Sequence, residues 1–599
     1  MAHPRQMSFC KRVKNRFPND FIGKKVLDVG SLDINGNNRY LFEDCDYTGI
    51  DLGAGENVDI VCKAHEHKGL YGTIISTEAF EHDPYIKESL NNIISNLLKP
   101  GGLFVFTCAG EGRSDHGTKS HHPYSAPFTN DHYMNLSEEI VMALVDIDFW
   151  FGERFRFESD LNAKDLYFVG RKEGASLDYQ APFWAFPKVS IIIPIIRPDK
   201  AERCIEAIKK NAGIPIDQYE IVTSVDTEAI GCPKMVEKLV ARTKYECVMF
   251  LGDDTVPLEG FVKHALNKMD EIPGGWGVVG LNTEDPTGQN TFAHWMAHKK
   301  MLDHFSDRQF FNTAYRHCWC DIELRDIASD MDRWLFSEDS LIQHDHPVNT
   351  GKAFDEGYAR AYSDEAKQHD LRTYFYRKRE RVKDGIALCL PCTYEKVYTH
   401  FMFSLIALER HYSRIIAPSS PGPLDAVRND LVVQALFQGC THILMMDTDQ
   451  IYNTVGLVKQ LESHDLPMVG GLVYRRYPPF DPLALRQGEQ YLDHVSIEEI
   501  ERGGLVEVDA TGCGCVLYDT RVFIDMMKSL DEKWFEFSTG NDGRPVGEDI
   551  GFCRKLKEMG HKIFVDCDVD IKHLSLLSID LNTHKLYNKL REVSQNGRE

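Results

Sequence analysis

The sequence predicts an α/β protein of three domains. Its 599 residues are several times the usual length of one hydrophobic core, and domains of roughly 100 to 200 residues imply about three. Three segments open with a short apolar strand pattern and continue with alternating helical and strand-like stretches, the pattern of parallel α/β units. These openings are residues 26–29 (VLDV), 189–193 (VSIII) and 386–390 (IALCL).

Two segments of distinct composition separate these units. Residues 172–187 (KEGASLDYQAPFWAFP) are rich in Gly, Pro and aromatic residues, and residues 352–384 are strongly charged, which indicates a connecting helix or hairpin. We expect domains at residues 1–178, 185–352 and 384–599, with a charged linker at residues 353–383.

Composition narrows the function classes. With 43% hydrophobic and 27% charged residues the chain is typical of a globular protein. It contains no run of 18 apolar residues and no apolar stretch behind its basic start, so we expect a cytoplasmic protein without a membrane span. The net charge of -23 argues against a nucleic-acid partner. Oligomeric state stays open.

The first domain has a ligand-binding pattern at its first two strands. The segment KKVLDVGSLDINGNNRYLF places a strand before a glycine turn, and the next strand ends with an acid in YTGIDL. In a doubly wound sheet, ligands bind at the carboxyl ends of the strands, where a glycine lets the backbone approach and an acid accepts ribose hydroxyls. Asp28, Gly30 and Asp51 occupy those places.

This order resembles the class I S-adenosylmethionine-dependent methyltransferases, with LLKPGGLFVF similar to a late family motif. The resemblance implies a Rossmann-like fold that binds S-adenosylmethionine through Asp28, Gly30, Asp51 and Glu78. The turn from Gly30 to Gly36 is longer than the family's Gly-x-Gly, so a scaffold without methyl transfer is the alternative. Four histidines are candidate general bases, and the sequence favours none of them: His82, His116, His121 and His122.

The second domain has adjacent acids at a strand end. One strand precedes Asp226, and the next, in KYECVMFLGDDTVP, runs into Asp253 and Asp254. Adjacent carboxylates repel each other unless a cation lies between them, which indicates a divalent metal. Mg2+ or Mn2+ bound there neutralises the charge that develops on a leaving diphosphate.

This pattern resembles the GT-A glycosyltransferases, the nucleotide-diphospho-sugar transferase fold, and family 2 in particular. The resemblance implies that Asp254 binds the metal with His344 or His346, and that Asp321 deprotonates the acceptor. The family's first motif acid is Gly252 here, so a degenerate domain is the alternative. The implied donor-binding residues are Pro194, Asp226 and Asp253.

The third domain carries an intact Asp-x-Asp in ILMMDTDQIY. Alternate residues at a strand end point the same way, so Asp447 and Asp449 can face one cation. Further on, Glu548 and Asp549 begin an amphipathic helix, and a last strand ends at His573. The acidic pair also suits the macrodipole of a helix N-terminus.

This order also resembles GT-A enzymes. The resemblance implies that Asp447, Asp449 and His573 hold the metal. It assigns the acceptor-activating base to Asp549, with Glu548 its neighbour, and places Arg428 near the nucleotide.

Together the domains predict a glycosyltransferase that moves sugars from nucleotide-diphosphate donors to a glycan or glycoconjugate. We expect a metal-dependent, inverting reaction with Mn2+ or Mg2+, and methylation of the glycan by the first domain. The rival hypotheses are a phage-type enzyme that glycosylates modified nucleobases and a scaffold in which one or more domains are degenerate.

Overall fold

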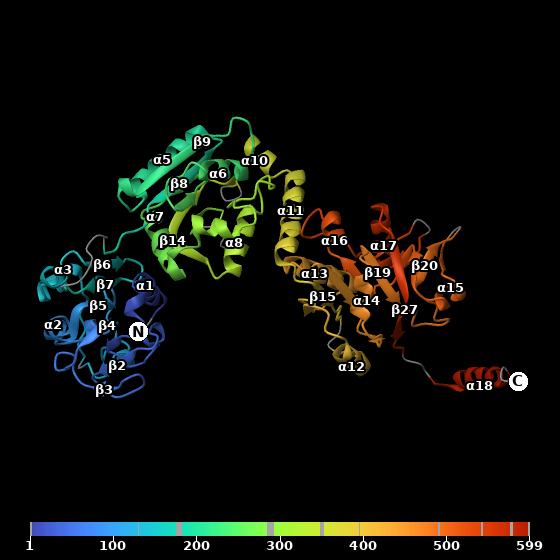
Figure 1. Cartoon of the computed structure of the whole chain (residues 1–599), viewed down its shortest axis with the longest axis horizontal. Coiled ribbons are helices and arrows are strands. Elements are labelled where there is room, and N and C mark those ends of the chain that lie inside the picture. The colour runs from blue at the N-terminus through green and yellow to red at the C-terminus, as the bar shows by residue number, and fades with distance from the viewer. Residues whose placement is uncertain are drawn as a thin grey trace. The chain divides into compact units, whose positions relative to one another are not determined.

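The computed structural model has mixed α/β architecture built on three large sheets of seven, seven and eight strands (Figure 1). The chain divides into two compact units, residues 1–313 with 324–357 and residues 314–323 with 358–599. The structure describes residues 3–129, 131–174, 183–283, 293–347, 351, 353–393, 396–488, 491–540, 543–575 and 579–596.

The first sheet, blue in Figure 1, has the strand order β3-β2-β1-β4-β5-β7-β6. Strands β1 to β5 are parallel, and β7 is antiparallel to both of its neighbours. The strand order reverses between β1 and β4, the kind of switch point at which open α/β sheets bind ligands. The strands are β1 (Lys25–Val29), β2 (Asp46–Asp51), β3 (Ile60–Val61), β4 (Tyr71–Thr77), β5 (Leu98–Ala109), β6 (Phe155–Asp160) and β7 (Asp165–Arg171).

Apolar residues cover both faces of this sheet. In β5, Leu103 and Val105 join a core with Phe9, whereas Phe104 and Phe106 join another core. Because both faces are buried, residues 103–106 of this strand (LFVF) are a continuous apolar run without polar alternation. The helices are α1 (Pro4–Arg16), α2 (Ile86–Asn92), α3 (Glu138–Leu144) and α4 (Ile147–Phe151).

The second sheet has the order β11-β14-β12-β13-β10-β8-β9. Its strands are β8 (Val189–Ile195), β9 (Tyr219–Val225), β10 (Cys247–Phe250), β11 (Thr255–Pro257), β12 (Val278–Asn282), β13 (Trp295–His298) and β14 (Trp334–His344). The helices of this region are α5 (Pro198–Asn211), α6 (Cys232–Val240), α7 (Phe261–Asp270) and α8 (Cys320–Asp330).

The third sheet, orange to red in Figure 1, has the order β16-β15-β17-β24-β19-β27-β18, with β22 paired to β27. Its strands are β15 (Ile386–Cys389), β16 (Arg414–Ile416), β17 (His442–Met446), β18 (Gln450–Tyr452), β19 (Met468–Leu472), β22 (Leu505–Val508), β24 (Cys515–Asp519) and β27 (Ile563–His573). Smaller strands are β20 (Ala484–Gln487), β21 (Leu492–His494), β23 (Ala510–Thr511), β25 (Ser538–Thr539) and β26 (Pro545–Val546). The helices are α12 (Thr399–Ala407), α13 (Leu424–Phe437), α14 (Leu457–Ser463), α15 (Ile497–Glu501), α16 (Arg521–Met526), α17 (Glu548–Glu558) and α18 (Leu581–Asn596).

The second and third sheets share one topology. Read from opposite ends, the two strand orders correspond position by position, with the same parallel and antiparallel pairings. In each, the short strand after the acidic turn pairs with the long last strand, Thr255 opposite His344 and Gln450 opposite His573. Asp254 and Asp449 therefore occupy equivalent positions.

The charged linker contains two helices, α10 (Glu356–Ala361) and α11 (Asp364–Val382). Despite its many charges, α11 is not solvated on every side, because Tyr374 and Phe375 are 1% exposed. With Leu371 these side chains form a stripe at helical spacing that packs inward.

The predicted domain limits stay a prediction, and residues 175–182 of the first boundary lie outside the described residues. Within the described ranges, no helix combines the length and the apolar character that crossing a membrane requires.

Candidate functional site

A cavity of about 580 Å3 lies at the carboxyl ends of β1, β2 and β4 in the first sheet. Asp28, Gly30, Asp51 and Glu78 all line it. The structure thus brings together the four residues that the sequence assigns to cofactor binding. The cavity lies at the switch point of the strand order, where doubly wound sheets bind ligands.

Gly30 sits where the backbone passes close to the next loop. Its φ is +77°, and a Cβ there would lie 2.3 Å from the Cβ of Ala79. The amides of Gly30 and Ser31 both donate to the carbonyl of Ile50, at 2.9 and 3.1 Å. A side chain at this position would strain the backbone and push the two loops apart.

We expect Gly30→Ala to destabilise the first sheet by more than the ~1–3 kcal/mol of a strained backbone alone, because the contact with Ala79 adds to it. Gly23→Ala is a matched control, since Gly23 has φ +62° and open space around its Cβ position. Hydrogen exchange of the β1 and β2 amides measures the local effect. Equal losses in both variants would contradict the packing argument.

The carboxylates of the cavity are held in a poorly hydrated environment. Asp28 is 1% exposed, and the Tyr47 hydroxyl donates to its Oδ2 at 2.6 Å. Burial raises the pKa of Asp28 to about 6. Burial also raises the pKa of Asp51, against the effect of the Leu32 amide, which donates to Oδ2 at 3.1 Å. Burial, helped by the nearby Glu81 charge, raises the pKa of Glu78 to about 7.

We expect Asp28→Asn to be more stable than the wild type, and by a larger margin at pH 7.5 than at pH 5. The raised pKa of Asp28 means that the folded protein holds a proton that the unfolded chain releases, so stability falls as pH rises from about 4 to about 6. Above that window the ionised carboxylate costs on the order of 2–3 kcal/mol, which Asn avoids. The difference in Tm between variant and wild type should grow through pH 6 and then level off. A Tm difference that does not change with pH would refute the raised pKa of Asp28 as the cause.

In the second sheet, the side chain of Asp253 accepts hydrogen bonds from the turn that follows β8. It is 3% exposed. Its Oδ2 accepts the amides of Ile196 and Arg197 at 2.7 and 2.6 Å, and its Oδ1 accepts Nη1 of Arg197 at 2.8 Å. These contacts fix the turn after β8. They leave Asp253 little capacity to bind the nucleotide-sugar donor.

Asp254 lies beside a histidine of the last strand. Its Oδ1 is 3.4 Å from Nε2 of His344, and the ring of His344 lies 5.2 Å from that of His346. The structure therefore brings Asp254 together with the predicted late histidines. They meet because β11, which begins directly after Asp254, pairs with the end of β14, where His344 lies opposite Thr255.

The other residues predicted in this domain have local roles in the structure. Pro194 is buried within β8. The carboxylate of Asp226 accepts the amides of Ile230 and Gly231 at 2.9 and 3.0 Å. Asp321 is the second residue of α8, and its Oδ1 accepts the amide of Ile322 at 2.9 Å.

His294 is a residue that the sequence did not single out. It is 2% exposed, and its ring centroid lies 4.8 Å from that of His344. Burial lowers its pKa to about 3, so the imidazole is neutral at pH 7. A Cβ at Gly252 would lie 2.9 Å from Oδ1 of Asp254 and 3.1 Å from Nε2 of His294. A single histidine before an apolar strand gives no indication in the sequence that it lies beside Asp254 and His344.

In the third sheet, Asp449 and His573 meet at the paired strands β18 and β27. Oδ2 of Asp449 is 3.2 Å from Nε2 of His573. Nδ1 of His573 donates to the carbonyl of Tyr474 at 2.6 Å. Histidines that bind metals usually donate their other ring nitrogen in this way, which directs the free nitrogen toward the ion.

Asp447 instead faces a buried arginine. Arg428 is 2% exposed, and its Nη2 donates to Oδ1 of Asp447 at 2.9 Å while Nη1 donates to Glu548. The structure therefore joins Asp447 and Glu548 through Arg428. Among the described residues, two groups of three side chains lie close enough to share an ion. Both lie within residues 3–165, and neither contains Asp447, Asp449 or His573.

Asp549 occupies in α17 the place that Asp321 has in α8, the second residue of the helix before the last strand. Its Oδ1 accepts the amide of Ile550 at 2.7 Å. Burial raises the pKa of Asp549, and the nearby Arg428 opposes that rise. A carboxylate with a raised pKa accepts a proton more readily than a solvated one.

No protein-family model and no curated protein matches the chain. The solved structures similar to it include two classes, glycosyltransferases and methyltransferases. One is a mannosyltransferase from Pyrobaculum calidifontis in complex with GDP-Man and Mn2+, at 13% identity and a TM-score of 0.25, covering 32% of this chain and 64% of that chain.

Two further structures represent these classes. TarS residues 1–349 from S. aureus in complex with UDP has 13% identity and a TM-score of 0.24, covering 32% of this chain and 65% of that one. A 1,6-didemethyltoxoflavin-N1-methyltransferase from Burkholderia thailandensis has 15% identity and a TM-score of 0.21, covering 29% and 92%. The chain spans just under two thirds of the mannosyltransferase and of the TarS fragment.

Proposed function

We propose that residues 384–599 transfer a glycosyl group from a nucleotide-diphosphate sugar to a hydroxyl of a glycan or glycoconjugate. The observation that carries this proposal is the pairing of Asp449 with His573, whose Nδ1 is held by the Tyr474 carbonyl. A carboxylate and a neutral imidazole nitrogen are ligands that suit Mn2+. A divalent cation bound there supplies positive charge for the departing diphosphate.

The remaining chemistry belongs to the side chains around this pair. Asp549 accepts the proton of the acceptor hydroxyl as that oxygen bonds to the anomeric carbon and the bond to the diphosphate breaks, which inverts the carbon. Arg428 holds Glu548 and Asp447 in place beside Asp549. Asp447, which accepts a hydrogen bond from Arg428, would be a further ligand for the ion once released from that contact.

We propose a second site of the same kind in residues 185–352. Asp254 with His344 or His346 would bind the ion, and Asp321 would be the base. Its support is the shared sheet topology, in which Asp254 and Asp449 occupy equivalent positions. Asp253, with its loop contacts, favours the alternative that this domain is a scaffold.

We propose that the first domain binds S-adenosylmethionine in the cavity and methylates the glycan. The residues present fit such a ligand: Gly30 brings the backbone to the cavity, Asp51 lies at the end of β2, and the hydroxyl of buried Ser31 has no hydrogen-bond partner in the described parts of the chain. The cofactor would supply an electrophilic methyl group, and Asp51 would orient its ribose.

The test is turnover of a panel of UDP- and GDP-sugars by the whole protein with Mn2+, with and without a chelator. We expect donor turnover that the chelator stops and added Mn2+ restores. Binding of S-adenosylhomocysteine, measured by calorimetry, tests the first domain independently. Turnover that is indifferent to the chelator would refute the metal site, and absence of turnover with every donor and with glycan acceptors would favour a scaffold.

A further inference from the structure

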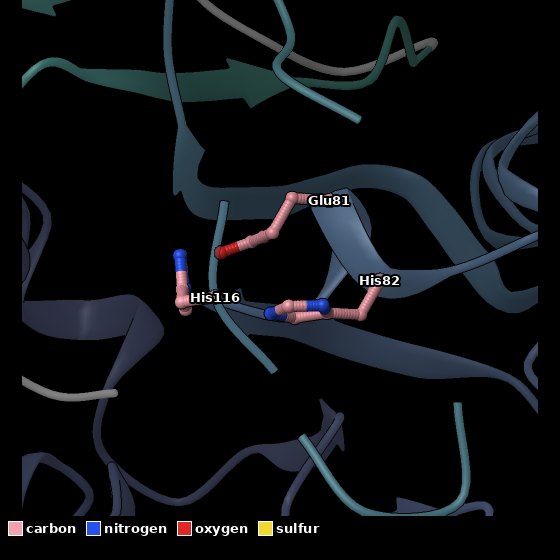
Figure 2. A group of neighbouring side chains, drawn as sticks. All are labelled: Glu81, His82 and His116. Atoms are coloured by element: carbon pink, nitrogen blue, oxygen red, sulfur yellow. The ribbon is translucent and has the colours of Figure 1, made fainter. Parts of the chain in front are cut away.

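Three buried side chains of the first domain converge beside the cavity. Glu81 and His82 lie in the short helix η3 (Phe80–His82) that follows β4, and His116 lies in the loop after β5. Figure 2 shows their polar ends directed toward one another. One ligand atom from each lies within 4.8 Å of the others.

Glu81 has an unusual environment for a carboxylate. It is 0% exposed, and neither of its oxygens makes a hydrogen bond of good geometry with a described residue. A buried charge without compensation is costly, so such groups are normally paired or bound to a metal.

Both imidazoles present a ring nitrogen to this carboxylate. Nδ1 of His82 lies 3.3 Å from the carbonyl of His132, and Nδ1 of His116 lies 3.3 Å from the carbonyl of Ser114. With Nδ1 donating to a carbonyl, each Nε2 carries a free lone pair, and Nε2 of His116 is buried without a partner in the described part of the chain. This is the arrangement that metal-binding histidines adopt.

We propose that Glu81, His82 and His116 form a binding site for one divalent transition-metal ion. Two imidazole nitrogens and one carboxylate favour Zn2+, Fe2+, Co2+ or Mn2+ over Mg2+ and Ca2+, which prefer oxygen ligands only. This site is separate from the glycosyltransferase centres, and it needs neither S-adenosylmethionine nor a sugar donor.

A neighbouring cluster shows the contrast. His3, Glu78 and Asp165 also lie within reach of one another, but Arg113 pairs with Glu78 at 3.1 Å and with Asp165. In this cluster, Arg113 therefore supplies the positive charge that balances the two carboxylates. The oxygens of Glu81 have no hydrogen-bond partner among the residues that the structure describes, and Arg113 acts on them only as a nearby charge, so an ion would supply the missing direct contact.

The site opens toward the cavity through His82, which lines it. Three protein ligands leave at least one coordination position of such an ion for another ligand, as in catalytic metal sites. We therefore expect an oxygen of a molecule in the cavity, such as a hydroxyl or carboxylate, to complete the coordination.

The test is titration of the whole, metal-stripped protein with Co2+, followed by its visible absorption and by calorimetry. We expect Glu81→Gln and His116→Gln each to lose one equivalent of bound Co2+, or to bind it at least about 10- to 100-fold more weakly, the loss that even an outer partner of a metal ligand causes. Glu111→Gln is the matched control, because it removes an exposed carboxylate from the same loop. Asp449→Asn identifies the equivalents that belong to the third domain.

A second readout guards against variants that fold poorly. In chelator, Glu81→Gln should melt at the wild-type temperature or above, because it removes a buried carboxylate that has no hydrogen-bond partner among the described residues. With saturating Co2+ the wild type should gain Tm and the variant should not. Equal Co2+ equivalents in wild type, Glu81→Gln and His116→Gln, or equal Tm gains, would overturn the proposal. So would failure of the wild type to bind Co2+ beyond what Asp449→Asn removes.

Discussion

Asp449→Asn is expected to reduce metal-dependent donor turnover by the third domain about 100- to 1,000-fold or more, the scale of losing charge stabilisation in a transition state. Asn keeps the size of the side chain but removes the charge that faces Nε2 of His573. Initial rates with Mn2+ and the best donor of the panel measure the loss.

Two variants complete this experiment. Asp531→Asn is the control, since Asp531 is exposed on a turn, and it should turn over at the wild-type rate. Asp254→Asn removes the equivalent acid of the second sheet, and residual turnover in each single variant assigns activity to the other domain. Full activity in Asp449→Asn together with loss in Asp254→Asn would place the chemistry in the second domain.

Arg428→Met is expected to destabilise the third domain by about 3–5 kcal/mol, the cost of breaking a buried ion pair by removing one partner. Arg428 is 2% exposed and pairs with both Glu548 and Asp447, so its loss leaves Glu548 as a buried charge without its cation. Hydrogen exchange of the α13 and β17 amides reports this loss within the whole chain.

The matched control is Arg476→Met. Arg476 is 3.1 Å from Asp449, but its side chain is 48% exposed, so we expect a change within about 1 kcal/mol. Equal destabilisation by both variants would mean that burial of Arg428 does not determine its contribution.

Much of the fold could be predicted from short apolar runs. Residues 26–29 and 189–193 lie within β1 and β8, and residues 386–389 form β15. These runs are mostly apolar because nearly every residue of the three strands is buried. Asp28, Gly30, Asp51 and Glu78 could be predicted to share a cavity because parallel strands bring their carboxyl ends to one edge.

The geometry within each site depends on contacts between distant segments. Sequence spacing indicates that Asp447 and Asp449 point the same way, but Arg428 holds Asp447 while His573 lies beside Asp449. Spacing also does not reveal that the amides of Ile196 and Arg197 occupy Asp253. The metal assignments of these acids stay predictions.

The repeated topology of the second and third sheets has a historical consequence at position 252. Asp447 and Gly252 each stand two residues before the acid that meets the last strand. A Cβ at Gly252 would lie 2.9 Å from Oδ1 of Asp254, so an aspartate there requires the end of that side chain to shift. If the second and third sheets descend from one ancestor, an acid can return at position 252 only together with a movement of the Asp254 side chain.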